Sequence, residues 1–354
     1  MAKIIFITRG LHDGGGIERV LSVIASGLSE RHHEIAIVAL EKSDTRCFPL
    51  NDNVEVLYPE DLPGLGAVRK LKNLYATREP DLVIAVGTNR SYLNVAAAEG
   101  YPLLSWEHFN CSIKSHPFHN MSRQLAAKKG GIITLTNEDA DLYRKRFKAK
   151  EVYTLYNPVT LPSVKKRNAN NKIVLAVGRL KTQKGFDRLL RSWAQVVRVY
   201  PDWLLRIVGS GPKEASLKKQ AERAGIAEYV EFIPYTDDIA AYYEDAEIFA
   251  LSSRYEGFAL VMLEAMSAGL PVVSYDIPFG LHELLQESGA GLLVESKSYS
   301  AYAYALMKLI ANDVLREEMA VKAEEKSKDF TLPVILDAWE KMIEEVTHLS
   351  EHKD

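Results

Sequence analysis

Cysteine is scarce in this chain: Cys47 and Cys111 are the two present among 354 residues. Two cysteines so far apart in the sequence predict neither a disulfide framework nor a cysteine-type zinc site. So few cysteines are typical of a protein in a reducing compartment. Long apolar runs are missing too, since no stretch reaches the roughly 18 apolar residues that a membrane-spanning helix needs. The N-terminal run is strand-like and lacks the layout of a signal peptide. We therefore expect a cytoplasmic protein, soluble or peripheral on the inner face of the membrane.

A strong net charge is also absent, because the formal value at pH 7 is -3. This argues against a dedicated nucleic-acid-binding protein, which would need a positive field to neutralise phosphates. Basic residues nevertheless gather between residues 62 and 158. The three clusters are Arg69-Lys70-Lys72, Arg123-Lys128-Lys129 and Arg144-Lys145-Arg146-Lys148-Lys150. Two interpretations stay open for them: solvated helix faces, or a patch that rests on anionic membrane lipid.

The sequence does contain a regular alternation of short apolar runs and longer stretches of helical periodicity. Runs of this kind, apolar on both faces, indicate parallel strands covered by helices. In the first half we expect strands at residues 4–8, 35–40, 54–58, 82–86, 103–106, 131–135 and 152–156. In the second half we expect them at residues 173–177, 204–208, 230–233, 248–251, 271–275 and 291–294.

The alternation is interrupted once, after Asn157-Pro158. Residues 162–171 are polar and basic and have no apolar periodicity, which predicts a linker. Each half opens on a strand, so we expect two Rossmann-like domains, at 1–158 and 172–331. A last helix is expected at 332–349, and its length would let it pack back on the first domain.

Two carboxylates in the segment 256–264 form the strongest candidate for chemistry. Glu256 precedes a predicted helix, and Glu264 is placed two turns inside it with apolar residues on every side. A helix that is apolar all round is buried, and a buried acid needs a partner. That partner is either an Arg from elsewhere in the chain or a ligand hydroxyl, for instance on a ribose.

Three cations precede the helix predicted at 186–199. Arg179, Lys181 and Lys184 lie in the segment 178–185, where positive charge opposes the helix macrodipole. The arrangement makes sense if an anion lies between these cations and the N–H groups at the helix start. The alternative is a surface loop with exposed lysines.

Two weaker features belong to the first domain. Gly14-Gly15-Gly16 precedes a helix and would let the backbone approach a ligand, although a flexible turn fits as well. A dinucleotide fingerprint is disfavoured because Arg19 stands where its third glycine belongs. His108 follows a strand, where a side chain can face a ligand or be structural.

Together, the order and spacing of these motifs resemble family 4 of the retaining glycosyltransferases. Their GT-B fold is α/β, with two facing Rossmann-like domains, parallel sheets and a central cleft. The resemblance runs nearly end to end and is most specific at Glu256 and at Glu264-Ala265-Met266. It implies a first domain on the acceptor side and a second domain that binds a nucleotide sugar.

The resemblance implies a role for each candidate residue. Arg179 and Lys184 would hold the donor diphosphate, and Glu264 would bind the ribose hydroxyls. Glu256, followed by Gly257 and Phe258, would contact the donor sugar. His108 would lie near the reacting sugar, and the Gly14, Gly15 and Gly16 backbone would approach the diphosphate from the opposite domain. The catalytic set is then Glu256, His108, Arg179 and Lys184.

A narrower resemblance points to members that build bacterial lipopolysaccharide or capsule from UDP-hexoses. It rests on Trp106-Glu107-His108-Phe109 and on the loop 276–283. The chain departs from the family pattern at Ala259, where many members have glycine or proline. It departs again at Phe279-Gly280, where a glycine doublet is usual, and both departures bear on which sugar is selected.

The implied reaction moves a hexose from a UDP-sugar to an acceptor hydroxyl, with retention. The hexose is galactose, glucose or an N-acetylhexosamine, and the acceptor is a lipid-linked oligosaccharide, lipopolysaccharide or exopolysaccharide. We expect no cofactor and no metal, because Arg179, Lys184 and helix N–H groups can stabilise the departing diphosphate electrostatically. The sequence shows no His/Asp cluster at metal-ligand spacing.

Other functions remain open on the same residues. The two-domain architecture also hosts nucleotide-sugar epimerases and phosphorylases. A catalytically silent nucleotide-sugar-binding protein is a further alternative, although such a protein would have no need to keep Glu256, Glu264, Arg179 and Lys184 together. A dinucleotide dehydrogenase is the least favoured.

Overall fold

The computed structural model describes residues 1–12, 14–43, 46–61, 66–112, 117–161, 171–278 and 281–351. Contacts divide the chain into two compact units, one made of Met1–Thr160 with Leu332–Asp354 and one of Leu161–Thr331. Most of the predicted linker lies outside the described residues, as do Phe279 and Gly280. Among the described helices, none combines the length and the apolar character that crossing a membrane would require.

The first unit is built on a seven-stranded sheet in which every pairing is parallel. The strand order is β3-β2-β1-β4-β5-β6-β7. The strands are β1 (Lys3–Thr8), β2 (Glu34–Ala39), β3 (Glu55–Leu57), β4 (Leu82–Val86), β5 (Leu103–Trp106), β6 (Gly131–Thr134) and β7 (Val152–Thr154). The inner strands are buried almost throughout, as their continuous apolar runs predict.

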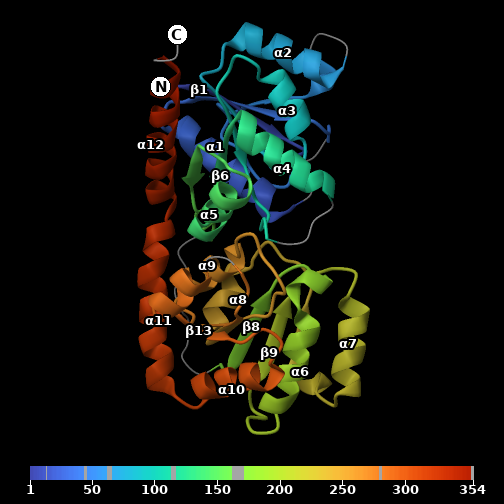
Figure 1. The fold of residues 1–354 in the computed structure, drawn as a ribbon. Helices are drawn as coiled ribbons and strands as arrows, with labels where there is room; N and C mark the ends of the chain where they lie inside the picture. The colour runs from blue at the N-terminus through green and yellow to red at the C-terminus, as the bar shows by residue number, and fades with distance from the viewer. Residues whose placement is uncertain are drawn as a thin grey trace. The chain divides into compact units, whose positions relative to one another are not determined.

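Helices cover both faces of this sheet (Figure 1). They are α1 (Gly16–Glu30), α2 (Ala67–Arg78), α3 (Ser91–Ala97), α4 (Pro117–Lys129), α5 (Asn137–Arg146) and α12 (Leu332–Glu351), with a 3₁₀ turn η1 (Pro59–Asp61). Parallel crossovers are right-handed, so α1, which leads away from β1 toward β2, lies on the face opposite to α2, α3, α4 and α5. Helix α12 contacts α1 and shares its face.

Helix α12 is fixed to this unit by an apolar stripe. Its buried residues recur at helical spacing and are Ile335, Leu336, Trp339, Met342, Ile343 and Val346. Trp339 contacts the rings of Phe6 and Trp106, with centroids 6.1 and 4.8 Å away. A side chain at Gly27 of α1 would collide with Leu336, so glycine permits the close approach of the two helices.

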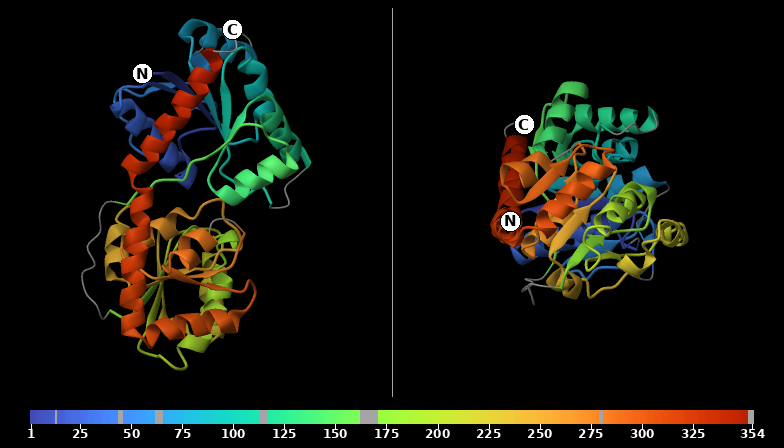
Figure 2. Two further views of the ribbon diagram at one scale, coloured as in Figure 1. Left: turned by 60° about the vertical axis from the view of Figure 1, so that its left-hand side comes forward. Right: turned by 90° about the horizontal axis from the view of Figure 1, so that it is seen from below.

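The second unit has a six-stranded parallel sheet in the order β10-β9-β8-β11-β12-β13. Its strands are β8 (Ile173–Val177), β9 (Leu204–Val208), β10 (Val230–Ile233), β11 (Ile248–Leu251), β12 (Val272–Tyr275) and β13 (Gly291–Val294). The two parallel sheets with their covering helices confirm the predicted fold class, two Rossmann-like α/β folds (Figure 2).

The helices of the second unit follow the apolar periodicity of the sequence. They are α6 (Phe186–Val196), α7 (Glu214–Arg223), α8 (Ala240–Asp245), α9 (Leu260–Ser267), α10 (Tyr299–Ile310) and α11 (Asp313–Ser327). Short 3₁₀ helices accompany them at η2 (Thr182–Lys184), η3 (Ala227–Tyr229) and η5 (Lys328–Phe330), and η4 (His282–Glu287) is a π-helix. In α6 the positions 186, 189, 190, 193 and 196 are all buried, which is one face of a helix.

Candidate functional site

The strand order of the second unit reverses direction between β8 and β11. From β8 the chain proceeds to β9 on one side, and from β11 it proceeds to β12 on the other. Ligands of open α/β sheets bind outside the carboxyl ends of the strands at such a switch point, because the two loops there diverge. The loop after β8 contains the predicted cations, and the loop after β11 contains Glu256.

Glycine shapes the loop after β8. Gly185 has φ +68°, a left-handed conformation, and a side chain there would overlap the carbonyl group of Ser252 in the loop after β11. The turn η2, which carries Lys184, ends at this glycine, and α6 begins directly after it. The backbone of the two loops therefore meets at Gly185, which brings Lys184 toward the second loop.

Hydrogen bonds join the two loops along their length. The Arg254 backbone N–H donates to the Gln183 carbonyl at 2.7 Å, and the Ser252 hydroxyl donates to the Lys184 carbonyl at 2.9 Å. The Arg254 guanidinium holds both carboxylate oxygens of Asp187, at 2.8 and 2.7 Å. Burial opposes ionisation of Asp187, but the bonds from Arg254 outweigh it and keep the pKa of this carboxyl below its usual range.

Lys184 and Glu256 are brought into direct contact. The Lys184 ammonium nitrogen lies 2.8 Å from Oε1 of Glu256, and both side chains are largely buried, at 18% and 11% exposure. Ser253 donates to the same oxygen at 2.5 Å. The two residues come from loops 72 positions apart, so the fold assembles a cation and a carboxylate side by side at the switch point.

Glu264 follows this pair in the sequence and is buried on helix α9. Its side chain is 2% exposed, and Oε2 accepts a hydrogen bond from the hydroxyl of buried Tyr243 at 2.9 Å. The helix begins at Leu260, so Glu264 is one turn inside it. The predicted position, two turns inside the helix, is wrong. Ala259 is the N-cap residue of this helix, with non-helical φ and ψ and no side-chain capping hydrogen bond.

The other predicted residues of this unit lie in the same two loops. Arg179 follows Gly178 at the end of β8 and is exposed. Gly257 and Phe258 are half-buried and connect Glu256 to α9. The ring of Phe258 contacts that of Phe330, with centroids 6.4 Å apart.

In the first unit the loop Gly14–Gly16 caps the N-terminus of helix α1. Gly14 has φ +56°, and the Gly15 backbone N–H donates to the Glu18 carboxylate at 3.0 Å, a capping interaction. Gly16 begins the helix. The Gly15 amide therefore already has an acceptor within the chain.

His108 is buried just after β5. Its ring packs against that of Trp106 in a tilted arrangement with centroids 4.4 Å apart, and 7% of the residue is exposed. Burial lowers the pKa of His108 to about 3, so the imidazole is neutral at physiological pH. Its Nε2 atom has no hydrogen-bond partner among the described residues. A neutral imidazole can give or accept one hydrogen bond, but it does not act as a cationic acid.

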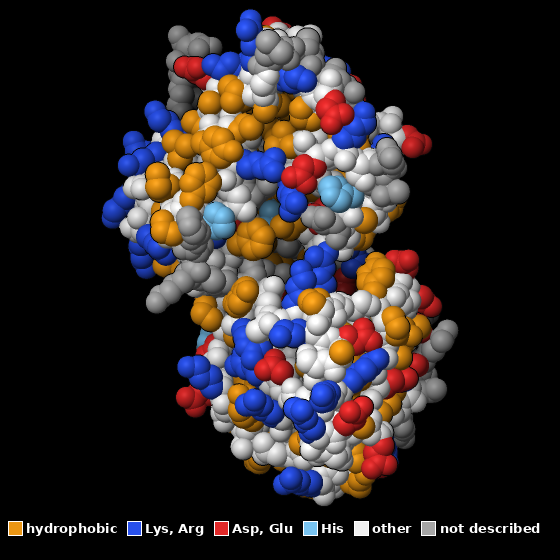
Figure 3. Space-filling model, turned by 90° about the vertical axis from the view of Figure 1, so that its right-hand side faces the viewer, with side chains coloured by type: hydrophobic (Ala, Val, Ile, Leu, Met, Phe, Trp, Pro, Cys, Tyr) orange, Lys and Arg blue, Asp and Glu red, His pale blue; other side chains and the backbone are white. Residues whose placement is uncertain are grey.

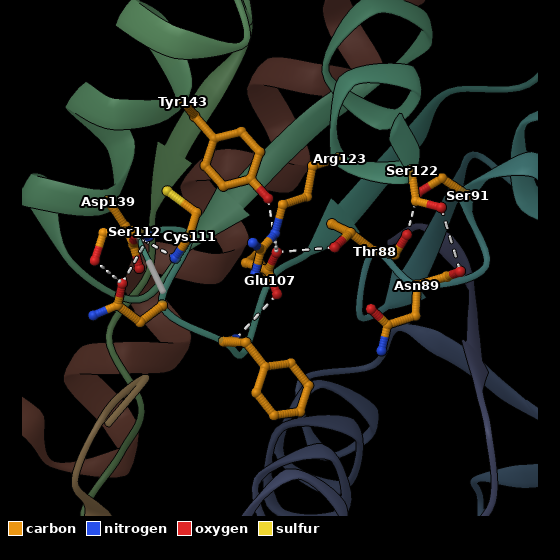
Figure 4. A network of polar contacts seen from close by, with 12 residues as sticks. Thr88, Asn89, Ser91, Glu107, Cys111, Ser112, Ser122, Arg123, Asp139 and Tyr143 are labelled. Atoms are coloured by element: carbon orange, nitrogen blue, oxygen red, sulfur yellow. Dashed lines mark hydrogen bonds and ion pairs between the residues drawn. The ribbon is translucent and has the colours of Figure 1, made fainter. Parts of the chain in front are cut away.

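The structure contains a buried ion pair beside His108, between Glu107 and Arg123, that the sequence analysis did not predict. Both oxygens of Glu107, which is 2% exposed, accept hydrogen bonds (Figure 4). The donors to Oε2 are Thr88 at 2.9 Å, Arg123 at 2.8 Å and Tyr143 at 2.7 Å. Oε1 accepts from the Phe109 backbone N–H at 3.0 Å. Glu107 thereby ties the turn that contains His108 to the loop after β4, through Thr88, and to α4 and α5.

The position of Arg123 corrects one prediction. The sequence groups it with Lys128 and Lys129 as part of a surface cluster, but the structure places its side chain at 5% exposure against Glu107. On α4 the residues Ser122, Arg123, Ala126 and Ala127 face inward, while both lysines are exposed. A charge count along the chain cannot separate these faces, whereas helical periodicity would have done so.

Known proteins match this chain along its length. A family model described as Glycosyltransferase Family 4 matches residues 14–161, and one described as Glycosyl transferases group 1 matches residues 160–326. An uncharacterised glycosyltransferase of Haemophilus influenzae is 30% identical over 96% of this chain and 99% of its own. The amylovoran biosynthesis glycosyltransferase AmsD of Erwinia amylovora is 25% identical over 96% and 99%. A Campylobacter jejuni α-1,4-N-acetyl-D-galactosaminyltransferase, named for an undecaprenol-linked glycan, is 25% identical over 98% and 99%.

Solved structures share the fold. Sucrose-phosphate synthase from Thermosynechococcus elongatus superposes with a TM-score of 0.84 at 17% identity, over 99% of this chain and 100% of its own. HepE of Anabaena, solved in complex with UDP and glucose, gives 0.80 at 21% identity over 97% and 100%. At these identities the likeness shows the architecture alone.

Proposed function

Because this chain belongs to the GT-B glycosyltransferases with family 4 and group 1 domains, we propose that it transfers a hexose from a UDP-sugar to a glycan hydroxyl with retention of configuration. The contact between Lys184 and Glu256 carries this proposal. In a nucleotide sugar, an anionic diphosphate and a ring of hydroxyl donors are one bond apart. A cation beside a carboxylate is the matching pair of binding groups.

The roles follow from the chemistry of these side chains. Lys184, with exposed Arg179, binds the diphosphate. Glu256 accepts hydrogen bonds from hydroxyls of the donor sugar, and Glu264 accepts them from the ribose hydroxyls. For His108 we propose one hydrogen bond to substrate from the neutral imidazole. For the backbone of Gly14–Gly16 we propose an approach to the diphosphate through groups other than the capped Gly15 amide.

Breaking the bond between the anomeric carbon and the diphosphate leaves positive charge on the sugar and negative charge on the leaving group. Lys184 and Arg179 stabilise that negative charge where it develops. The acceptor oxygen forms the new bond, and its proton passes to the departing diphosphate. Glu256 is held by Lys184 and Ser253, so we assign it to binding the sugar and not to the acid or base role of a glycosidase carboxylate.

Relatives support the donor and the acceptor class. HepE was solved with UDP and glucose, the Erwinia relative is named for amylovoran biosynthesis, and the Campylobacter relative is named for an undecaprenol-linked glycan. We therefore propose UDP-galactose, UDP-glucose or a UDP-N-acetylhexosamine as donor. The proposed acceptor is a lipid-linked oligosaccharide, lipopolysaccharide or exopolysaccharide.

The test of this function is UDP release from each UDP-hexose, with and without a bacterial glycolipid extract. The proposal predicts that release depends on the extract and that the radiolabelled sugar moves into it. Conversion of the donor to its epimer without any extract would instead identify an epimerase. Binding of UDP without turnover, on any acceptor tried, would identify a silent nucleotide-sugar-binding protein.

Transfer is expected to continue without a divalent metal. The charge on the leaving group is met by Lys184, Arg179 and the N–H groups at the start of α6, a task that a metal performs in other enzymes. Purified protein treated with EDTA should keep its initial rate. The proposal of metal independence is wrong if EDTA abolishes activity and added Mg²⁺ or Mn²⁺ restores it.

A further inference from the structure

Large apolar side chains are exposed together on the first unit, on helices α3 and α4. Tyr92, Phe118 and Met121 are 55%, 48% and 66% exposed. The rings of Tyr92 and Phe118 meet edge to face with centroids 6.1 Å apart, and Met121 follows Phe118 by one helical turn. We call these three residues the apolar patch. One exposed apolar side chain is ordinary, whereas a contiguous group indicates a contact surface.

The outward stripe of α4 changes from apolar to basic along the helix. Phe118 and Met121 are followed by half-buried Leu125 and then by exposed Lys128 and Lys129. These positions recur at the spacing of one helical face. Lysines at a helix C-terminus also complement the helix dipole. However, α4 contains no Asp or Glu at all, so its exposed face carries no negative charge.

Neighbouring helices add basic residues on the same face, two of which pair with acids: Lys72 with Glu99 at 3.0 Å and Arg144 with Asp141 at 3.3 Å. Helices α2, α3, α4 and α5 cover the same face of the sheet: α2 contacts α3, α3 contacts α4, and α4 and α5 share a buried cluster. The basic clusters at 69–72, 128–129 and 144–146 therefore belong to one face of one unit. Figure 3 shows hydrophobic side chains gathered on this unit with Lys and Arg along one edge.

We propose that this face docks on an anionic lipid bilayer. Tyr, Phe and Met can enter the boundary between headgroups and acyl chains, while lysine heads stay at the level of the phosphates. Stable attachment to a membrane takes two signals, and this surface offers both apolar insertion and positive charge. Membrane docking is a property separate from sugar transfer, and it can be measured in the absence of donor and acceptor.

The experiment is co-sedimentation of the full chain with vesicles of phosphatidylcholine, alone or mixed with phosphatidylglycerol. The wild type should bind the mixed vesicles and release from them as salt is raised. The variant Lys128→Glu/Lys129→Glu should lower the partition coefficient by at least roughly 30-fold, since each basic residue contributes about fivefold. The variant Phe118→Ser/Met121→Ser should also weaken binding, with little change in its salt dependence.

Matched controls come from the second unit. Lys219→Glu/Arg223→Glu on α7 makes the same charge change, and Val199→Ser removes an exposed apolar side chain, at 58% exposure. Both controls should bind the mixed vesicles as the wild type does. The stabilisation of every variant by UDP should be unchanged, which separates loss of docking from loss of fold or of the donor site.

Two results would overturn the proposal. The first is that both test variants bind mixed vesicles as tightly as the wild type does. The second is that the charge control Lys219→Glu/Arg223→Glu weakens binding as much as Lys128→Glu/Lys129→Glu does, which would mean that the net charge of the protein, and not this face, determines binding. If the apolar variant changes the elution volume in size-exclusion chromatography and leaves vesicle binding intact, the apolar patch is a contact between copies of this chain.

Discussion

Replacing Lys184 with alanine is expected to lower the rate of sugar transfer by roughly 10²–10³-fold, the effect of removing one donor that stabilises developing negative charge. Lys184 is the cation that the fold brings next to Glu256, at 2.8 Å, the carboxylate proposed to bind the sugar. Its loss removes charge stabilisation from the leaving diphosphate, so kcat should fall. Initial rates at saturating donor measure this effect.

The matched control is Lys218→Ala on α7. Lys218 also pairs with a glutamate, Glu214, at 2.7 Å, but both side chains are exposed on a helix surface. Such a pair contributes a few tenths of a kcal/mol to stability and lies in no candidate site. The control should therefore keep its rate. Near-normal turnover of Lys184→Ala would remove this residue from the mechanism.

Replacing Arg123 with methionine is expected to destabilise the first unit by about 3–5 kcal/mol, because it leaves the Glu107 carboxylate buried without its cation. Glu107 is 2% exposed, so water cannot substitute for the lost partner. Adding Glu107→Gln to Arg123→Met should recover part of the loss, since it removes the unpaired charge and the amide oxygen can still accept from Thr88 and Tyr143 at the position of Oε2.

Hydrogen exchange of peptides from the first unit, followed through a urea titration, measures this change separately from the second unit. Arg144→Met is the matched control, because Arg144 pairs with Asp141 at 3.3 Å and both side chains are at least half exposed. Its effect should stay within 1 kcal/mol or so. If Arg123→Met is as mild as the control, the buried pair does not support the turn that contains His108.

Much of the fold could be predicted because buried parallel strands leave a simple signal. A strand covered on both faces reads as a short apolar run, and β4, β5, β6 and β8 do so. Helix α12 was expected at 332–349, and its length suggested that it packs back on the first domain, which the structure confirms. Its attachment to α1 required the structure, because periodicity does not say which surface is covered.

The candidate site was only partly predictable. Lys184 and Glu256 could be selected by residue type and by position beside predicted helices, but their contact spans 72 residues and depends on how the loops meet at Gly185. The partner of Glu264 was expected to be an arginine or a ligand, and one partner in the structure is the hydroxyl of Tyr243. Aromatic hydroxyls give no charge signal in a sequence.

The Glu107 pair shows a second limit. Arg123 comes from α4 and Glu107 from the end of β5, and each looks like an ordinary surface charge when read alone. Burial is decided by the packing of α4 on the sheet, which places the inward stripe at Ser122, Arg123, Ala126 and Ala127. A predicted helix with alanines at those positions, and an arginine in the same stripe, would have indicated a buried cation.

The most direct test of the account is thermal unfolding of the protein with UDP, GDP, ADP or NAD, each at millimolar concentration and without metal. A ligand at about 100 times its dissociation constant adds roughly 2.7 kcal/mol to stability, which is a clear shift. The account predicts that UDP alone gives this shift and that Glu264→Ala and Lys184→Ala abolish it. A shift with NAD and none with UDP would contradict the account.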